Sequence, residues 1–204
     1  MKYKSYLLLG VIAFGGFVNV FAEKMSEPEK QDKAETNELS AYVASSKQTV
    51  GIFAKSLKGT LKAAIKEGGF ANGISVCNEK ALPIAEKVSK EQGFTIKRIS
   101  LKNRNPNNAP NDWQKKVLED FSAKHAKGAD LKKMAYAKIV ETEGKKQFRF
   151  VKAIPTGNLC LKCHGETITP DVEAKLAELY PDDKARGFKL GDLRGAFVIT
   201  KDLD

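Results

Sequence analysis

The sequence is poor in the side chains that usually hold metals or act as nucleophiles and bases. Its 204 residues include only three Cys, two His and one Trp. It shows no Ser/His/Asp set, no paired-carboxylate signature and no phosphate-binding glycine loop. These absences argue against the common hydrolase and nucleotide-binding motifs. No apolar run after residue 22 approaches the length of a transmembrane helix, so we expect no membrane span in the mature chain.

Two of the three cysteines fall in one hexapeptide. Residues 160–165 read CLKCHG. C-x-x-C-H is the c-type haem attachment pattern, in which two thiols add to the haem vinyl groups and the adjacent histidine ligates the iron. We interpret Cys160 and Cys163 as the covalent attachment sites of one haem c, and His164 as the proximal iron ligand.

Two other uses of a C-x-x-C motif are weaker. A structural zinc site needs a second pair of ligands at short spacing, and only Cys77 and His125 remain, isolated and far apart. A thioredoxin-like redox motif opens a helix after a strand in a βαβ unit. The sequence predicts no such unit around residues 155–165, so haem attachment is the favoured interpretation.

The N-terminus predicts export. Residues 1–22 begin with two lysines, continue through an apolar stretch and reach the small-x-Ala pattern at Val20-Phe21-Ala22. We interpret 1–22 as a signal peptide; an uncleaved anchor is the alternative, because the apolar stretch is at the short limit for a span. Haem is covalently attached outside the bacterial cytoplasm, so the leader and the haem motif together predict a periplasmic protein.

The charge balance is basic. The formal net charge is +10, and the leader carries two lysines and no acids, which leaves +8 on the mature chain. In an exported protein we expect no nucleic-acid partner; an acidic redox partner or an anionic membrane surface suits the charge better. The alternative is that the lysines only solvate helix faces.

The mature chain is predicted to form one domain. Residues 23–37 are charged and nearly free of large apolar side chains, which indicates a flexible tether before a domain at 38–204. Apolar residues recur at helical intervals from 38 to 67, and Gly68-Gly69 stops this helix. A second helical pattern covers 74–88, and Pro83 is expected to kink or split it.

The rest of the domain alternates strands and short helices. A helix is expected to open at Asn111-Asp112, and another to run from Thr169-Pro170 to about Tyr180-Pro181. The predicted strands are 94–101, 135–142, 147–154 and 195–200, with 135–154 forming a hairpin across Glu143-Gly144. Helices in front and an antiparallel sheet behind give an α+β fold class.

An ordered set of short motifs between residues 39 and 201 carries a resemblance to a known family. The motifs are ISVC at 74–77, RIS at 98–100, RNPN at 104–107, NL before the haem motif, YPDDKARG at 180–187 and GDLRGA at 191–196. With them the chain resembles a family of exported single-haem c-type domains, long known only as a domain of unknown function. The resemblance implies a PAS-like antiparallel sheet with N-terminal helices and one covalently bound haem. Family members occur alone or as sensory parts of signalling proteins; this chain has no kinase or transmitter segment, so a signal would need a separate partner.

The residues alone leave the second axial ligand open. The sulfur and imidazole candidates are Cys77, His125, Met25 and Met134. Met25 lies beside the cleavage point, Met134 suits packing, and a helix-end histidine between lysines suits capping. Cys77 on its own suits a small buried hydrophobe or an intermolecular disulfide. The resemblance implies ligation by histidine and a cysteine thiolate, and it matches Cys77 as the distal ligand.

These expectations define a function and one alternative to it. A thiolate ligand lowers the reduction potential, and its release on reduction would open a site for a small gas. We therefore expect a non-enzymatic redox or gas sensor with a redox or signalling protein partner. The alternative is a periplasmic electron carrier that docks to acidic partners. Four arginines are candidates for binding the haem propionates: Arg98, Arg104, Arg186 and Arg194.

Overall fold

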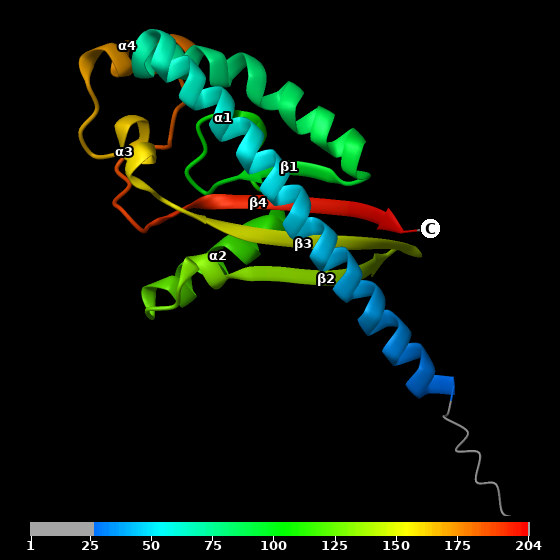
Figure 1. Cartoon of the computed structure of the whole chain (residues 1–204). Helices are drawn as coiled ribbons and strands as arrows, with labels where there is room; N and C mark the ends of the chain where they lie inside the picture. The colour runs from blue at the N-terminus through cyan, green and yellow to red at the C-terminus, as the bar shows by residue number, and fades with distance from the viewer. Residues whose placement is uncertain (1–26, 204) are drawn as a thin grey trace, which may run out of the picture.

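An antiparallel sheet with a helical layer on each face forms the body of the protein (Figure 1). The structure is a computed structural model that describes residues 27–203, with side-chain surroundings from Glu35 onward. The α+β class predicted from the sequence is confirmed. Within the described residues, no helix combines the length and the hydropathy that crossing a bilayer requires.

The first helical layer is α1 (Glu27–Gln92), which folds back on itself at Gly68 and Gly69. Gly69 has a φ of 74°, a conformation that glycine adopts without a Cβ penalty. The two limbs then pack closely at Gly73, where a Cβ would lie 2.9 Å from Ile65 Cγ1. Asn72 Nδ2 donates a hydrogen bond of 2.9 Å to the carbonyl oxygen of Ala64 across the turn. The predicted stop at 68–69 is confirmed.

Two expectations for α1 differ from the structure. Residues 27–37, expected to be part of a flexible tether, continue the helix; residues 23–26 lie outside the described residues. This segment is rich in the good helix formers Glu, Lys, Gln and Ala, and Pro28 stands in the first turn, where it costs no hydrogen bond. Pro83 does not split the second limb, because it and Glu79, whose carbonyl it leaves without a donor, lie on the exposed side of the helix.

The sheet has the strand order β1-β4-β3-β2, with all neighbours antiparallel. The strands are β1 (Thr95–Ile99), β2 (Ala135–Thr142), β3 (Lys145–Pro155) and β4 (Leu193–Leu203). β2 and β3 form the predicted hairpin, and both turn residues, Glu143 and Gly144, have the positive φ of a tight primed turn. β4 lies between β1 and β3, so the C-terminal strand joins β1 to the β2–β3 hairpin.

Each face of the sheet carries one apolar cluster, and successive side chains of β3 alternate between the two clusters. Phe148 and Phe150 are fully buried against α1, whereas Val151 and Ala153 face α2 (Asp112–Ala126). α2 begins at the predicted place, where Asn111 and Gln114 form a capping box. Two short 3-10 turns, η1 (Pro106–Asn108) and η2 (Leu131–Lys133), bracket this helix.

A third apolar cluster lies at one end of the sheet. It joins Ile74 of α1 to Val172 and Leu176 of α4 (Pro170–Leu179), and Cys163 packs against it. α4 begins with Thr169 at the N-cap and Pro170 in the first turn, as predicted. The cluster therefore holds the second limb of α1 beside the haem motif, which lies on α3 (Asn158–His164) between β3 and α4.

Candidate functional site

The haem motif lies on the short helix α3, which follows β3. β3 ends at Pro155 with an irregular register, and α3 follows within three residues. Cys160 and Cys163 are three residues apart, so they share one face of the helix. Gly165 ends the helix at a crowded point, since a Cβ there would lie 2.6 Å from the carbonyl oxygen of Leu161. The motif is thus helical.

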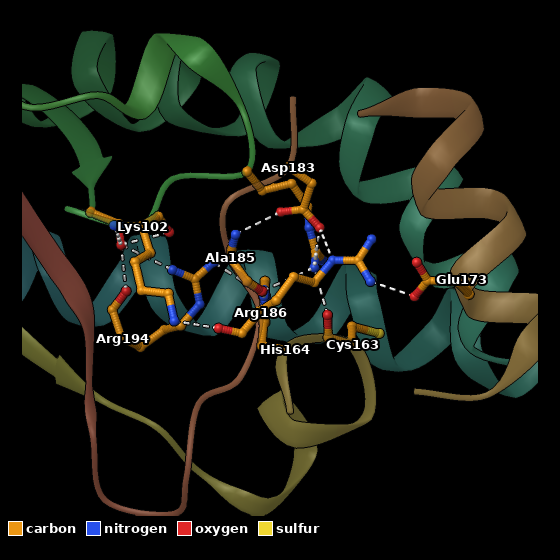
Figure 2. A network of polar contacts seen from close by, with 10 residues as sticks. Lys102, Cys163, His164, Glu173, Asp183, Ala185, Arg186 and Arg194 are labelled. Atoms are coloured by element: carbon orange, nitrogen blue, oxygen red, sulfur yellow. Dashed lines mark hydrogen bonds and ion pairs between the residues drawn. The ribbon is translucent and has the colours of Figure 1, made fainter. Parts of the chain in front are cut away.

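The ring of His164 has both nitrogens engaged, as Figure 2 shows. Nδ1 lies 2.9 Å from the carbonyl oxygen of Ala185, and Nη2 of Arg194 lies 3.2 Å from Nε2. Because a guanidinium only donates, Nε2 accepts and Nδ1 carries the proton. Burial, with the charges of Arg194 and Arg104, lowers the pKa of His164 to about 2. The imidazole is therefore neutral, with its Nε2 lone pair available as a metal ligand.

Residues 183–188, which follow α4, hold the His164 ring and its backbone in place. The backbone N–H of Phe188 donates to the carbonyl oxygen of His164 at 2.9 Å, and that of Gly187 donates to Gly165 at 3.0 Å. The Phe188 ring meets the imidazole edge-on, with 6.3 Å between centroids and 85° between planes. Asp183 Oδ1 accepts from the backbone N–H of Ala185 at 2.8 Å, which orients the carbonyl that binds Nδ1.

A buried ion pair connects this segment to the motif. Arg104 Nη2 lies 3.1 Å from Asp183 Oδ2 and 2.5 Å from the carbonyl oxygen of Cys163. Asp183 is only 4% exposed. Burial alone would raise the pKa of Asp183, but hydrogen bonds from Arg104 and from the backbone of Ala185 outweigh it and lower that pKa. Arg186 donates to the same carboxylate at 2.6 Å and pairs with Glu173 (Figure 2).

The third cysteine, Cys77 on α1, acts electrostatically on the motif. Burial raises the pKa of the Cys77 thiol, and the charges of Arg98 and Arg104 oppose that shift. Burial also raises the pKa of Cys163; Arg104 opposes this shift and the charge of Cys77 adds to it. Cys77 thus shares its electrostatic surroundings with the motif although 83 positions separate it from Cys160 in the sequence. All three cysteines are free thiols.

The other axial candidates lie in different surroundings. Met134 is 8% exposed and packs in the core between the sheet and α2. His125 lies at the end of α2, where Nδ1 is 3.3 Å from the carbonyl oxygen of Ala129. Met25 lies outside the described residues. Of the four candidates, the structure brings Cys77 into the electrostatic surroundings of the motif.

Three residues of the site were not predicted from the sequence as site residues. Ala185 acts through its backbone, Phe188 packs on the imidazole, and Tyr180 lies near Cys77, Arg98 and Arg104. Burial raises the pKa of Tyr180, while a hydrogen bond with Asn78 lowers it. Ala185 and Tyr180 belong to the YPDDKARG motif, whose turn-forming residues indicated an irregular segment. Nothing in the sequence showed which residues this segment contacts.

The residues present fit a covalently attached haem. Two thiols three positions apart could form the thioether bonds to a haem, and a neutral imidazole and a third cysteine could ligate its iron. The surroundings are also short of acceptors: Nε of Arg104 is a buried donor without a partner, and Arg98 makes no hydrogen bond or ion pair with the described residues. Haem propionates are the acceptors that such arginines lack.

Comparison with known proteins agrees with this fit. Residues 22–201 match the family model described as Tll0287-like. The chain belongs to the Tll0287-like family. A solved structure, "Crystal structure of the cyanobacterial heme-protein Tll0287", is similar to this Tll0287-like chain with a TM-score of 0.55 and 26% sequence identity. The match covers 80% of this chain and 94% of that chain. No curated protein matches the sequence.

Two open hollows flank the network in this Tll0287-like protein. The larger, of about 600 Å³, is bordered by residues 165–168 with Glu173 and Arg186. The smaller, of about 160 Å³, lies beside Ser100, Phe188 and Gly195. His164 and Cys77 are not among the lining residues of either hollow, and the guanidinium of Arg194 lies 3.2 Å from His164 Nε2.

Proposed function

We propose that this Tll0287-like chain is an exported c-type cytochrome with one haem, attached through Cys160 and Cys163, and that it senses redox state or a small gas. His164 and Cys77 are the axial ligands in this proposal. The observation that carries it is the fixed, neutral His164 ring, which offers Nε2 beside two attachment thiols and a third sulfur. The likeness to a structure titled as a heme-protein supports the cofactor.

The proposed haem supplies a one-electron iron centre, and the chain tunes it. The Nδ1–H bond to Ala185 makes the imidazole a stronger donor and holds its orientation. Burial raises the pKa of the Cys77 thiol, so a Cys77 sulfur released from the iron takes up a proton rather than staying an anion. Protonation would oppose rebinding of this sulfur, as a ligand switch at Cys77 requires.

α1 is the element through which we expect a signal to leave the site. Cys77 lies in its second limb, which the Gly68–Gly69 turn joins to the long first limb across the sheet (Figure 1). A change of ligation at Cys77 then shifts one limb against the other. A PAS-like sensory domain in the periplasm, without enzymatic activity and acting on a separate protein, is the form of this proposal; the leader on which export rests lies outside the described residues.

Ferric electron paramagnetic resonance tests the ligand assignment. The matured protein is expected to give a low-spin thiolate/imidazole signal that disappears in Cys77→Ala. His125→Ala is the matched control, because that ring contacts Ala129 at the end of α2, and its spectrum should equal the wild type. A Cys77→Ala spectrum identical to the wild type rejects Cys77. Carbon monoxide binding to the ferrous wild type, with loss of the sulfur ligand, supports sensing.

One observation favours the electron carrier as a second candidate. Residues 39–66 of α1 contain five lysines and no Asp or Glu. Lys55, Lys58, Lys62 and Lys66 are exposed at helical spacing, and none makes an ion pair with the described residues. An acid-free basic face suits docking to an acidic partner. A carrier should exchange electrons rapidly with ferricyanide, more slowly at high salt and in Lys55→Gln/Lys58→Gln/Lys62→Gln. Lys87→Gln, which removes a lysine already paired with Glu91, is the control.

A further inference from the structure

We propose that Arg98 and Arg194 bind the two haem propionates, and that Arg194 leaves His164 to do so when the haem is loaded. This rests on the proposed function, and it selects two of the four arginines that the sequence offered. The selection depends on which arginines already have a negative partner.

Arg104 and Arg186 are already compensated. Arg104 forms the buried pair with Asp183 and also donates to the carbonyl oxygen of Cys163. Arg186 donates to Asp183 at 2.6 Å and pairs with Glu173. Arg104 is held between Asp183 and the haem motif, and Arg186 is held between Asp183 and Glu173, as the right half of Figure 2 shows for Arg186. Each of the two guanidinium groups therefore already has a carboxylate partner, although Nε of Arg104 lacks an acceptor.

Arg98 and Arg194 have no acidic partner among the described residues. Arg194 contacts Ser100 Oγ at 3.3 Å, His164 Nε2 at 3.2 Å and the face of Phe188, with 5.1 Å from Cζ to the ring centroid. Arg98 makes no hydrogen bond or ion pair with that part of the chain. Burial and the charges of Arg98 and Arg104 lower the pKa of Arg194 to about 10. Two partly buried cations that form no ion pair among the described residues match the two negative charges of the propionates.

The two arginines lie at the same end of neighbouring strands. Arg98 is on β1 opposite Phe197 of β4, and Arg194 stands three positions before that residue. Ser100 Oγ donates to the carbonyl oxygen of Arg194 at 2.8 Å, which ties the two strands together there. Gly195 permits this approach, because a Cβ would lie 2.3 Å from the carbonyl oxygen of Ile99. A bound group with two carboxylates can therefore meet both guanidinium groups at this end of the two strands.

Arg194 also occupies the atom that an iron would take. The Nε2 lone pair accepts the Arg194 N–H now, and one lone pair cannot serve a hydrogen bond and an iron at once. Iron ligation by His164 therefore frees the guanidinium from its nitrogen acceptor. A propionate replaces that neutral acceptor with an anionic one, so the contact becomes an ion pair that can be bidentate. In the haem-free chain, Arg194 keeps His164 in the ligating tautomer.

Binding of haemin and of haemin dimethyl ester to Cys160→Ala/Cys163→Ala tests the proposal without covalent attachment. The free acid should bind about tenfold or more tightly than the ester. Arg98→Gln and Arg194→Gln should each reduce this preference, and together they should abolish it while ester affinity is kept. Arg186→Gln is the control and should retain the preference.

The outcomes separate this proposal from the proposed function. Equal affinity for acid and ester in the parent variant overturns the assignment of the arginines but leaves a haem protein. Binding of neither compound overturns both. Should the double arginine variant not fold, infrared spectra of holoprotein loaded with ¹³C-carboxylate haem replace it. The propionate bands should then shift in Arg98→Gln and in Arg194→Gln, and bands that move only in Arg186→Gln contradict the proposal.

Discussion

The ring of His164 is held by the carbonyl oxygen of Ala185, 21 residues later in the chain, through a hydrogen bond of 2.9 Å to Nδ1. This contact, together with the N–H that Arg194 donates to Nε2, decides the tautomer and with it which nitrogen faces the site. It also joins the haem motif to the segment that carries Asp183 and Phe188. The chemistry proposed for the motif therefore depends on a loop that contributes no ligand of its own.

Covalent attachment is the first prediction to check. Haem in the matured protein should stay with the polypeptide in acidified acetone, because two thioether bonds hold it. Cys160→Ala/Cys163→Ala should release it completely, whereas Cys77→Ala should retain it, since Cys77 is assigned to the iron and not to a vinyl group. Release of haem from the wild type would show that the motif is not an attachment site.

Loss of the Asp183 carboxylate should destabilise the protein. Asp183→Asn leaves Arg104 buried without a counter-charge and weakens the support of Ala185. We expect the free energy of unfolding to fall by about 3 kcal/mol, the usual cost of breaking one side of a buried pair. Glu173→Gln removes the half-exposed partner of Arg186 and should cost less than about 1 kcal/mol. Urea unfolding of the holoprotein measures both changes, and equal losses would contradict the difference in burial.

The same carboxylate predicts a pH dependence. Its pKa is lowered in the folded protein, so the folded state binds this proton less readily than the unfolded chain. Its contribution is therefore complete above the unfolded pKa of about 4 and disappears as the pH falls through the folded pKa. The stability difference between wild type and Asp183→Asn should shrink below about pH 4. A difference that stays constant from pH 6 to pH 2 would rule out Asp183 as the titrating group.

Two glycines of α1 should respond to alanine in opposite directions. A Cβ added at Gly73 would lie 2.9 Å from Ile65 Cγ1 and 3.1 Å from Leu61 Cδ1. Gly73→Ala should therefore push the two limbs apart and lower the free energy of unfolding by about 1–2 kcal/mol. Gly59 is exposed, with nothing within 4 Å of an added Cβ. Gly59→Ala should stabilise by about 0.5–1 kcal/mol through helix propensity. Thermal unfolding of the pair checks the signs, and stabilisation by Gly73→Ala would disprove close packing of the limbs.

Export predicts a new N-terminus. When the full chain is produced in a bacterium that matures c-type cytochromes, cleavage after Ala22 should give a periplasmic protein beginning at Glu23. N-terminal sequencing of the periplasmic fraction measures this directly. A chain that keeps Met1 and sediments with the membrane would instead establish the anchor alternative. Substitution of Ala22 by Arg should block cleavage, because the position before the cut requires a small side chain.

Local signals in the sequence were sufficient for most of the elements. The Gly68–Gly69 stop, the Asn111 cap, the Glu143–Gly144 turn and the Thr169–Pro170 start all stand where they were predicted. Each depends on contacts within a few residues, where backbone preference and capping chemistry decide the outcome. Pro83 shows the limit of such signals, because its effect depended on which side of α1 faces solvent.

The motif at 160–165 determined from sequence alone which residues carry the proposed chemistry, because covalent attachment fixes their spacing. Only the tertiary structure decided how they are held. Cys77 reaches the motif because α1 folds back and packs on α4. The His164 tautomer depends on a backbone carbonyl, which every residue type possesses and no sequence pattern reveals. Four arginines looked alike in the sequence; among the described residues, Asp183 and Glu173 form ion pairs with Arg104 and Arg186, whereas Arg98 and Arg194 form none.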